Sequence, residues 1–173
     1  KYQNNVGGGW SEFLVRHQNQ VFSIPNEMDD NLAVLMEPVA ASLHAVLRSP
    51  PREDDRILIV GGGAIGLGVL VSILALDITP IEITVLARHD FQRKAALKFG
   101  SHHVVNEENT LETLSDILNT AILGTGENQM LNDGFDIIYD CVASNTTFNN
   151  GLKWLRPRGS MLVVGTNSIL KNI

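Results

Sequence analysis

The stretch that decides the fold reads Arg56-Ile57-Leu58-Ile59-Val60-Gly61-Gly62-Gly63-Ala64-Ile65-Gly66-Leu67-Gly68. An apolar run, typical of a parallel strand buried on both faces, leads into a glycine cluster, and an apolar helical pattern follows. In this order, the G-x-G-x-x-G spacing predicts a site for a dinucleotide pyrophosphate at the start of the helix. Gly61 would make the turn, Gly63 would let the pyrophosphate approach the backbone, and Gly66 would let the helix lie close to the sheet.

A plain glycine turn that ends a strand is the alternative interpretation of this stretch. The flanking patterns favour the dinucleotide site. The helix predicted from Ala64 to about Leu76 is apolar nearly all round, but it is shorter than the roughly 18 residues of a membrane span. A P-loop is excluded, because no Lys-Ser/Thr pair follows the glycines.

Composition narrows the class of protein. The chain has 173 residues, of which 44% are hydrophobic and 18% charged, enough to bury the core of one domain or slightly more. Its net charge of −6 argues against binding to nucleic acid or a membrane surface. Cys141 is the single cysteine, so no disulfide framework exists, and we expect a cytoplasmic protein.

The front of the chain differs from the rest. Residues 10–16 and 21–25 predict two short strands, which need partner strands to form a core. From Asn31 the pattern is helical, with a break before Pro38, a residue that suits a first helical turn. The predicted apolar stripe of this helix consists of Val39, Leu43, Val46 and Leu47.

Strands and helices then alternate. The predicted strands cover residues 57–60, 82–87, 102–105, 135–142 and 160–165, and the predicted helices cover 64–76, 91–99, 111–123 and 146–155. This alternation predicts an α/β fold with a doubly wound parallel sheet. A full dinucleotide fold has a sixth strand. We therefore expect the last strand to be an unpaired apolar edge, and the isolated chain to self-associate or to be poorly soluble.

Several motifs, taken together and in order, resemble the medium-chain dehydrogenase/reductase family, which includes zinc-dependent alcohol, polyol (sorbitol) and threonine dehydrogenases. They are Gly9-Trp10-Ser11-Glu12-Phe13, Ile24-Pro25, Glu37-Pro38 with His44-Ala45, Val60-Gly61-Gly62-Gly63-Ala64-Ile65-Gly66, Ala96 with Phe99-Gly100, and Gly159-Ser160 with Val163-Val164-Gly165. The resemblance implies that residues 34–173 are a Rossmann domain, incomplete at its C-terminus. It also implies that residues 1–33 are a β remnant of a GroES-like catalytic domain.

The family resemblance further implies the chemistry. The parent enzyme would move hydride between an alcohol carbon and a nicotinamide ring while a zinc ion polarises the oxygen, and it would be a dimer or tetramer. Two alternatives remain open: a nucleotide-binding sensor or regulatory module without catalysis, and a zinc-free reductase of the same superfamily.

Zinc ligation is the point at which the chain departs from the family. Glu37 matches a carboxylate found at the catalytic zinc in the polyol branches, although an acid favoured by the helix dipole is the plain alternative. A catalytic zinc needs three protein ligands. His102 and His103 are adjacent on a strand and would point to opposite faces, and we expect His44 to be packed and hydrogen-bonded. We therefore expect zinc to be absent from these residues and the 173-residue chain to be inactive alone.

The end of the second strand predicts the choice of cofactor. An acid there binds the ribose 2′-OH of NAD, whereas an Arg accommodates the 2′-phosphate of NADP. The strand ends in Ala87-Arg88, with Arg93 as a further cation, so we predict NADP over NAD. A solvated loop residue is the alternative for Arg88, and Asp90 is better explained as a helix N-cap.

The remaining predicted cofactor contacts follow from the carboxyl ends of the strands, outside which ligands bind in such sheets. Asp140 would border the adenosine half of the groove. Cys141 would lie beside it as a small buried apolar residue. The complete predicted set is Gly61, Gly63, Ala64, Ile65, Gly66, Arg88, Arg93, Cys141, Val142, Val164, Gly165 and Thr166.

Overall fold

The computed structural model describes residues 12–78 and 82–166. The chain divides into two units, residues 1–35 and residues 36–173. We describe each unit by itself.

Within its described residues, 12–35, the first unit contains two short helical elements, η1 (Gln18–Gln20) and α1 (Asp30–Ala33). The prediction of two strands here is wrong, because residues 12–16 and 21–25 belong to no strand, while residues 10 and 11 lie outside the described part. Phe13 and Val15 are 89% and 91% exposed. Val21 has extended backbone angles. An extended segment becomes a strand only when a partner pairs with its backbone groups, and the described residues of this unit provide no such partner.

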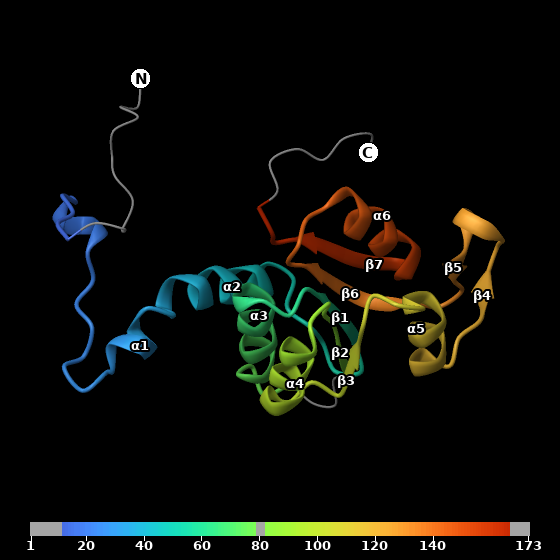
Figure 1. The fold of residues 1–173 in the computed structure, drawn as a ribbon, viewed down its shortest axis with the longest axis horizontal. Coiled ribbons are helices and arrows are strands. Elements are labelled where there is room, and N and C mark those ends of the chain that lie inside the picture. The colour runs from blue at the N-terminus through green and yellow to red at the C-terminus, as the bar shows by residue number, and fades with distance from the viewer. Residues whose placement is uncertain (1–11, 79–81, 167–173) are drawn as a thin grey trace, which may run out of the picture. The chain divides into compact units, whose positions relative to one another are not determined.

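The second unit is an α/β domain of the Rossmann type built on a parallel sheet. In chain order its elements are α2 (Met36–Arg48), β1 (Arg56–Val60), α3 (Ala64–Leu74), β2 (Glu82–Leu86), α4 (Asp90–Phe99), β3 (His103–Val105), α5 (Thr110–Leu118), β4 (Ile122–Leu123), η2 (Gly126–Asn128), β5 (Met130–Leu131), β6 (Phe135–Asp140), α6 (Asn145–Trp154) and β7 (Leu155–Val163). The five-stranded sheet has the order β3-β2-β1-β6-β7 (Figure 1). The strand order reverses direction at β1, where a doubly wound sheet leaves a crevice for ligands.

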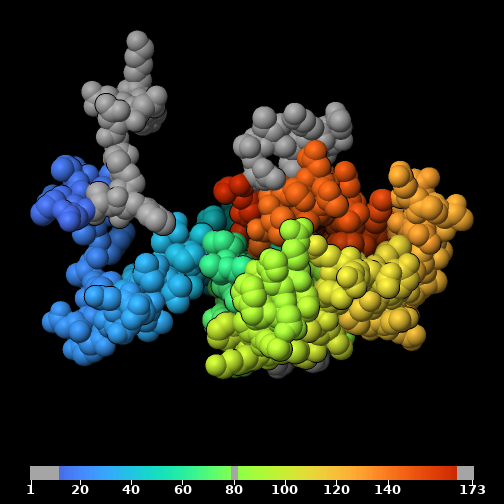
Figure 2. Space-filling view, in the orientation of Figure 1, coloured from blue at the N-terminus to red at the C-terminus, as the bar shows by residue number. Residues whose placement is uncertain are grey.

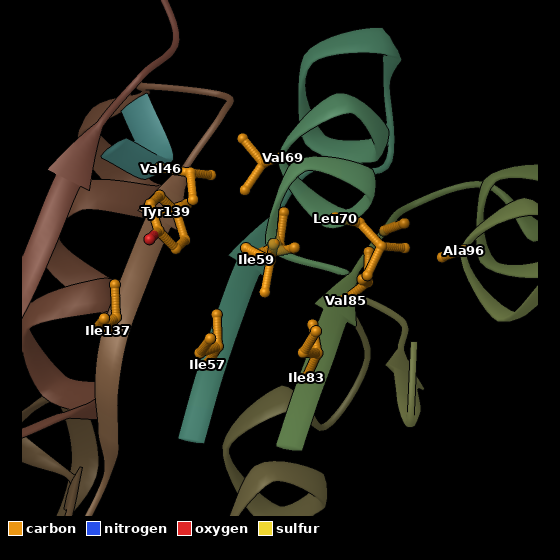
Figure 3. Packing of buried hydrophobic residues seen from close by; sticks show 12 residues of the cluster. Val46, Ile57, Ile59, Val69, Leu70, Ile83, Val85, Ala96, Ile137 and Tyr139 are labelled. Atoms are coloured by element: carbon orange, nitrogen blue, oxygen red, sulfur yellow. The ribbon is translucent and has the colours of Figure 1, made fainter. Parts of the chain in front are cut away.

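Helices cover both faces of this sheet. Ile57 and Ile59 of β1 pack with buried residues of α2, α3 and α4, as Figure 3 shows for Val46, Leu70 and Ala96. The alternate residues of the same strand, Leu58 and Val60, pack on the other side with α5 and α6. Because successive side chains of a strand point to opposite faces, a fully apolar β1 is what a doubly covered strand requires.

Helix α2 buries a face different from the predicted stripe. Val46 is buried, but Val39, Leu43 and Leu47 are exposed, and Ser42 is buried in their place. The Ser42 hydroxyl donates to the carbonyl oxygens of Pro38 (2.7 Å) and Ile65 (3.1 Å). A Cβ on Gly68 of α3 would lie 2.5 Å from the Ser42 Oγ. The two helices approach so closely that only small residues fit between them.

The C-terminal half differs from prediction at several boundaries. The predicted helix 111–123 ends at Leu118, because Asn119 adopts left-handed angles (φ 48°). Residues 122–123, predicted as helix, pair antiparallel with residues 130–131, predicted as loop. The resulting hairpin lies beside α5 (Figure 2). Strand β7 starts at Leu155, before the predicted turn at 157–159, and its register shifts opposite Phe135 and Ile137.

Two further observations complete the fold. The Tyr139 hydroxyl of β6 donates to the Ser49 carbonyl oxygen just after α2 (2.6 Å), which ties that helix to the sheet. In the described part of the chain, no helix is both long and apolar enough to cross a membrane.

Candidate functional site

A cavity of about 840 Å³ opens at the carboxyl ends of the sheet strands. Its wall is formed by the turn after β1, the residues after β2 and β3, and the loop after β6. Its volume suits a cofactor-sized ligand. The cavity therefore lies at the crevice expected from the reversal of strand order at β1.

The glycines after β1 shape the floor of this cavity. Gly61 has φ 104° and donates its N–H to the Leu86 carbonyl oxygen (2.8 Å), which joins the turn to β2. A Cβ on Gly66 would collide with the Gly61 carbonyl oxygen. Gly62, which sequence reasoning missed, is also confined, because a Cβ there would lie 2.7 Å from that of Ala87 and 2.9 Å from that of Gln92.

Gly63 is the exception among these glycines. It precedes α3 as its N-cap residue and lines the cavity, and a Cβ there would meet no protein atom within 4 Å. The N–H groups of the first turn of a helix have no partner within the helix. An open cradle at a helix N-terminus fits the charge and shape of a pyrophosphate.

Arg88 and Glu107 form an ion pair on the cavity wall. The Arg88 Nε donates to the Glu107 Oε2 (2.8 Å), and both side chains are more than half exposed. The hydrogen bond that Arg88 donates to Glu107, together with the negative charge of Glu107, raises the pKa of Arg88 above its usual value. Arg88 thus occupies the predicted place, but a carboxylate already pairs with it.

The Arg93 side chain bonds to the backbone and not to the cavity. Its Nη1 donates to the carbonyl oxygens of Ala87 and Arg88 (both 2.7 Å), and Arg93 is not among the residues that line the cavity. This arginine therefore supports the backbone that carries Arg88. The prediction that Asp90 caps α4 is wrong by one position, because His89 is the N-cap residue and Asp90 begins the helix.

Asp140 organises the loop after β6. Its buried carboxylate accepts from the N–H groups of Val142 (3.0 Å) and Ala143 (2.9 Å) and from the Thr147 hydroxyl (2.9 Å). These bonds hold Cys141 and Val142, both of which line the cavity. Burial raises the pKa of the Cys141 thiol to about 12, with the Asp140 charge as a second cause, which makes this cysteine a poor nucleophile.

The predicted contacts after β7 lie one layer further away. The N–H groups of Val164 and Gly165 donate to the Asp140 carbonyl oxygen (2.8 and 3.0 Å). A Cβ on Gly165 would lie 2.9 Å from the Cys141 backbone. Neither residue lines the cavity, and neither does Thr166.

The structure does not gather the predicted metal and histidine residues. Glu37 is exposed on the first turn of α2 and is not part of the cavity wall. Among the described residues, no group of three His, Cys, Asp or Glu could hold a metal ion. His44 is exposed, which contradicts the expectation that it is packed. His102, just before the edge strand β3, accepts from the Ile83 N–H (3.0 Å), and His103, its first residue, pairs with Glu82 (2.9 Å).

Other residues of the cavity wall were not found from sequence. Ser144 and Thr147 form a capping box at the start of α6, and their Ser-x-x-Thr spacing after a strand was the available signal. Val60 and Gly62 belong to the glycine stretch but were not predicted as contacts. The rest gave no local signal, because distant segments bring them together. These residues are Leu86, His89, Gln92, Glu107, Thr110, Thr146, Asn150 and Trp154.

Comparisons with known proteins give a consistent picture. The sequence model of the family described as zinc-binding dehydrogenase matches residues 64–172. Sorbitol dehydrogenase of Bacillus subtilis is 26% identical over 165 residues, which cover 94% of this chain and 43% of that protein. The chain thus spans less than half the length of this relative.

Two solved structures share the fold. A short chain alcohol dehydrogenase from E. coli CFT073, complexed with NADH, superposes with a TM-score of 0.70 at 19% identity, covering 88% of this chain and 41% of that one. A putative zinc-binding dehydrogenase from Sinorhizobium meliloti 1021, bound to NADP, gives a TM-score of 0.63 at 22% identity, covering 83% and 39%. At these identities, the two structures establish the likeness of fold.

Proposed function

Because the chain belongs to the zinc-binding dehydrogenase family, we propose that residues 34–173 form the cofactor-binding domain of a cytoplasmic alcohol or polyol dehydrogenase that prefers NADP to NAD. Residues 1–33 would belong to its catalytic domain, and the complete enzyme would be a dimer or tetramer. The similarity to sorbitol dehydrogenase supports a polyol or another small alcohol as the substrate.

The observation that carries this proposal is the glycine cradle at the start of α3. Gly61 and Gly66 close the turn against each other, while the space beside Gly63 is open. The pyrophosphate would lie there against the helix N-terminus. When bound, the nicotinamide ring would supply the chemistry by accepting or giving a hydride at the alcohol carbon.

The chain's own residues would hold and orient that cofactor. Ile65 lines the cavity at the first turn of α3 and would pack near the nicotinamide end. Cys141 and Val142, held by the Asp140 network, would form the opposite wall. Val164 and Gly165 would support that loop through their bonds to the Asp140 carbonyl oxygen. Thr166 would follow them on the nicotinamide side, outside the cavity wall.

The residues present do not fit a zinc site, since the described part of the chain offers no group of three ligands. No step of the reaction is therefore assigned to zinc here. We propose Glu37 only as one catalytic carboxylate at a zinc whose other ligands come from outside these residues. The 173 residues alone would bind cofactor without oxidising an alcohol.

The preference for NADP is tested by comparing the affinities of the two cofactors. In Arg88→Ala, NADP affinity should fall by about tenfold while NAD affinity changes little, because a charge-assisted bond to the 2′-phosphate is lost. Cofactor titrations followed by fluorescence give both affinities.

Lys94→Ala is the matched control for this test. It removes one positive charge from α4, where Lys94 pairs with Asp90 (2.7 Å) and lines no part of the cavity. Equal affinities of the wild-type chain for NADP and NAD would refute the preference.

A further inference from the structure

Glu107 faces Arg88 because of strand register. Strands β2 and β3 pair in parallel with Leu86 opposite Val105, and the Ala87 N–H donates to the Val105 carbonyl oxygen (2.9 Å). Two residues beyond the end of each strand, the continuation of this register places Arg88 opposite Glu107. The bond between the Arg88 Nε and the Glu107 Oε2 (2.8 Å) follows from that placement.

The turn that carries Glu107 is held by local hydrogen bonds. The Asn106 side-chain oxygen accepts from the Glu108 N–H (3.1 Å), and the Asn106 carbonyl oxygen accepts from the Thr110 hydroxyl (3.1 Å). Thr110 lines the cavity together with Glu107. The carboxylate of Glu107 is therefore presented to the cavity from a fixed backbone.

A carboxylate at this place acts oppositely on the two forms of the ribose. It occupies a donor of the guanidinium that would bind a 2′-phosphate, and it repels that phosphate. A free 2′-OH, in contrast, can donate a hydrogen bond to it, as it does to the acid at the end of the second strand in NAD-binding folds. In this chain Ala87 directly follows the second strand, β2, and the acid, Glu107, comes from the segment after the neighbouring strand β3.

We propose that Glu107 is a specificity-determining residue of the cofactor site. Its carboxylate partly neutralises the positive charge of Arg88 and so reduces the difference in affinity between a ribose 2′-phosphate and a free 2′-OH. The inference rests on the proposed cofactor site at this cavity. It adds that the preference is set by an Arg–Glu pair from two strands, and that the Glu member favours the unphosphorylated ribose.

The test uses the 173-residue chain and two small ligands that carry the ribose end alone: adenosine 2′,5′-bisphosphate and 5′-AMP. Isothermal titration calorimetry gives their affinities for the wild-type chain, for Glu107→Gln and for Glu108→Gln. The Glu108 variant is the matched control, because Glu108 is an exposed acid on the same turn that does not line the cavity.

The ratio of the two affinities is the readout. In Glu107→Gln the ratio of bisphosphate to AMP affinity should rise about fivefold, the size expected for removing an exposed charge pair, and the rise should be larger at low salt. In Glu108→Gln the ratio should change by less than about twofold. In an Arg88→Ala background, the effect of Glu107→Gln should shrink, because the two side chains act as a pair.

Failures of the two proposals are distinguishable. An unchanged ratio in Glu107→Gln, or an equal rise in Glu108→Gln, would overturn the role of Glu107 and leave the cofactor site standing. A wild-type chain that prefers AMP, with a ratio that rises in Glu107→Gln, would support Glu107 and refute the NADP preference. Binding of neither ligand to the wild-type chain would overturn both proposals.

Discussion

Gly63 and Gly66 lie three positions apart in one turn, yet their surroundings are opposite. A Cβ on Gly66 would collide with the Gly61 carbonyl oxygen, whereas a Cβ on Gly63 would meet no protein atom within 4 Å. Gly66 is thus required by the fold itself. The fold leaves room for a side chain at Gly63, so under the proposed function only a ligand that approaches the backbone would require a glycine there.

This difference predicts two separable variants. Gly66→Ala should lower the free energy of unfolding by about 1–3 kcal/mol or more, because the helix must move away from the turn. The free energy of unfolding of Gly63→Ala should be within about 1 kcal/mol of the wild-type value, but this variant should lose most of its affinity for NADP. Urea unfolding and cofactor titration measure the two effects. A Gly63→Ala chain that binds NADP as tightly as wild type would contradict the cradle.

Cys141 makes stability depend on alkaline pH. Burial raises the pKa of its thiol from 9.0 to about 12 in the folded chain. Above pH 9 the thiol loses its proton in the unfolded chain but keeps it in the folded one. The contribution of this thiol to the free energy of unfolding is therefore intact below pH 9 and is lost as pH rises toward 12.

We expect this single group to lower the free energy of unfolding by about 1.4 kcal/mol for each pH unit above pH 9. Cys141→Ala should remove that slope and leave the part that other groups contribute. Urea unfolding at pH 8, 9 and 10 gives the free energy of unfolding of the wild-type and Cys141→Ala chains. If this free energy changes with pH equally in both chains, the thiol is not buried as described.

At the level of elements, α2 and α3 are joined by small residues. Ser42 is fully buried against Gly68, while the neighbouring Leu43 is 37% exposed. Hydrophobic periodicity favours Leu43 as a core residue and gives no weight to Ser42. The two helices lie close together because Gly68 has no side chain. As a result Ser42 is buried and Leu43 is exposed.

Substitutions at these two adjacent positions should therefore change stability in the order opposite to the one that side-chain hydrophobicity suggests. Ser42→Leu should lower the free energy of unfolding by about 1–3 kcal/mol, because the larger side chain forces the helices apart. Leu43→Ala should lower it by less than about 1 kcal/mol, as expected at an exposed site. Chemical denaturation of both variants measures this, and a greater loss in Leu43→Ala would refute the observed helix contact.

For the molecule as a whole, the cavity belongs to one of the two units. All of its lining residues lie between Val60 and Trp154, within the unit that begins at Met36. The apolar side chains of Phe13, Val15 and Phe22 in the other unit are exposed.

Deletion of residues 1–35 should leave the cofactor site working. We expect NADP affinity within about twofold of the 173-residue chain and a cooperative thermal transition, because the core clusters lie within residues 36–166. Calorimetry and cofactor titration of the shortened chain provide the measurement. Loss of binding would mean that the first unit supports the cavity.

The doubly wound parallel sheet could be predicted from the sequence, because it rests on local patterns. The apolar run of β1, the glycine turn and the alternation of strands and helices all lie in short stretches. The wrong predictions include the pairing of strands and the positions at which elements end. Residues 12–16 and 21–25 have strand-like composition but no strand to pair with in the described part of their unit, and α5 ends early because Asn119 turns left-handed.

The glycine cradle and the position of Arg88 after β2 follow from residues that are adjacent in the chain. The pairing of Glu107 with Arg88, the turn of Arg93 toward the backbone and the burial of Ser42 follow only from the folded structure, because these contacts depend on strand register and helix separation. Both are set by packing between segments that lie far apart in the sequence.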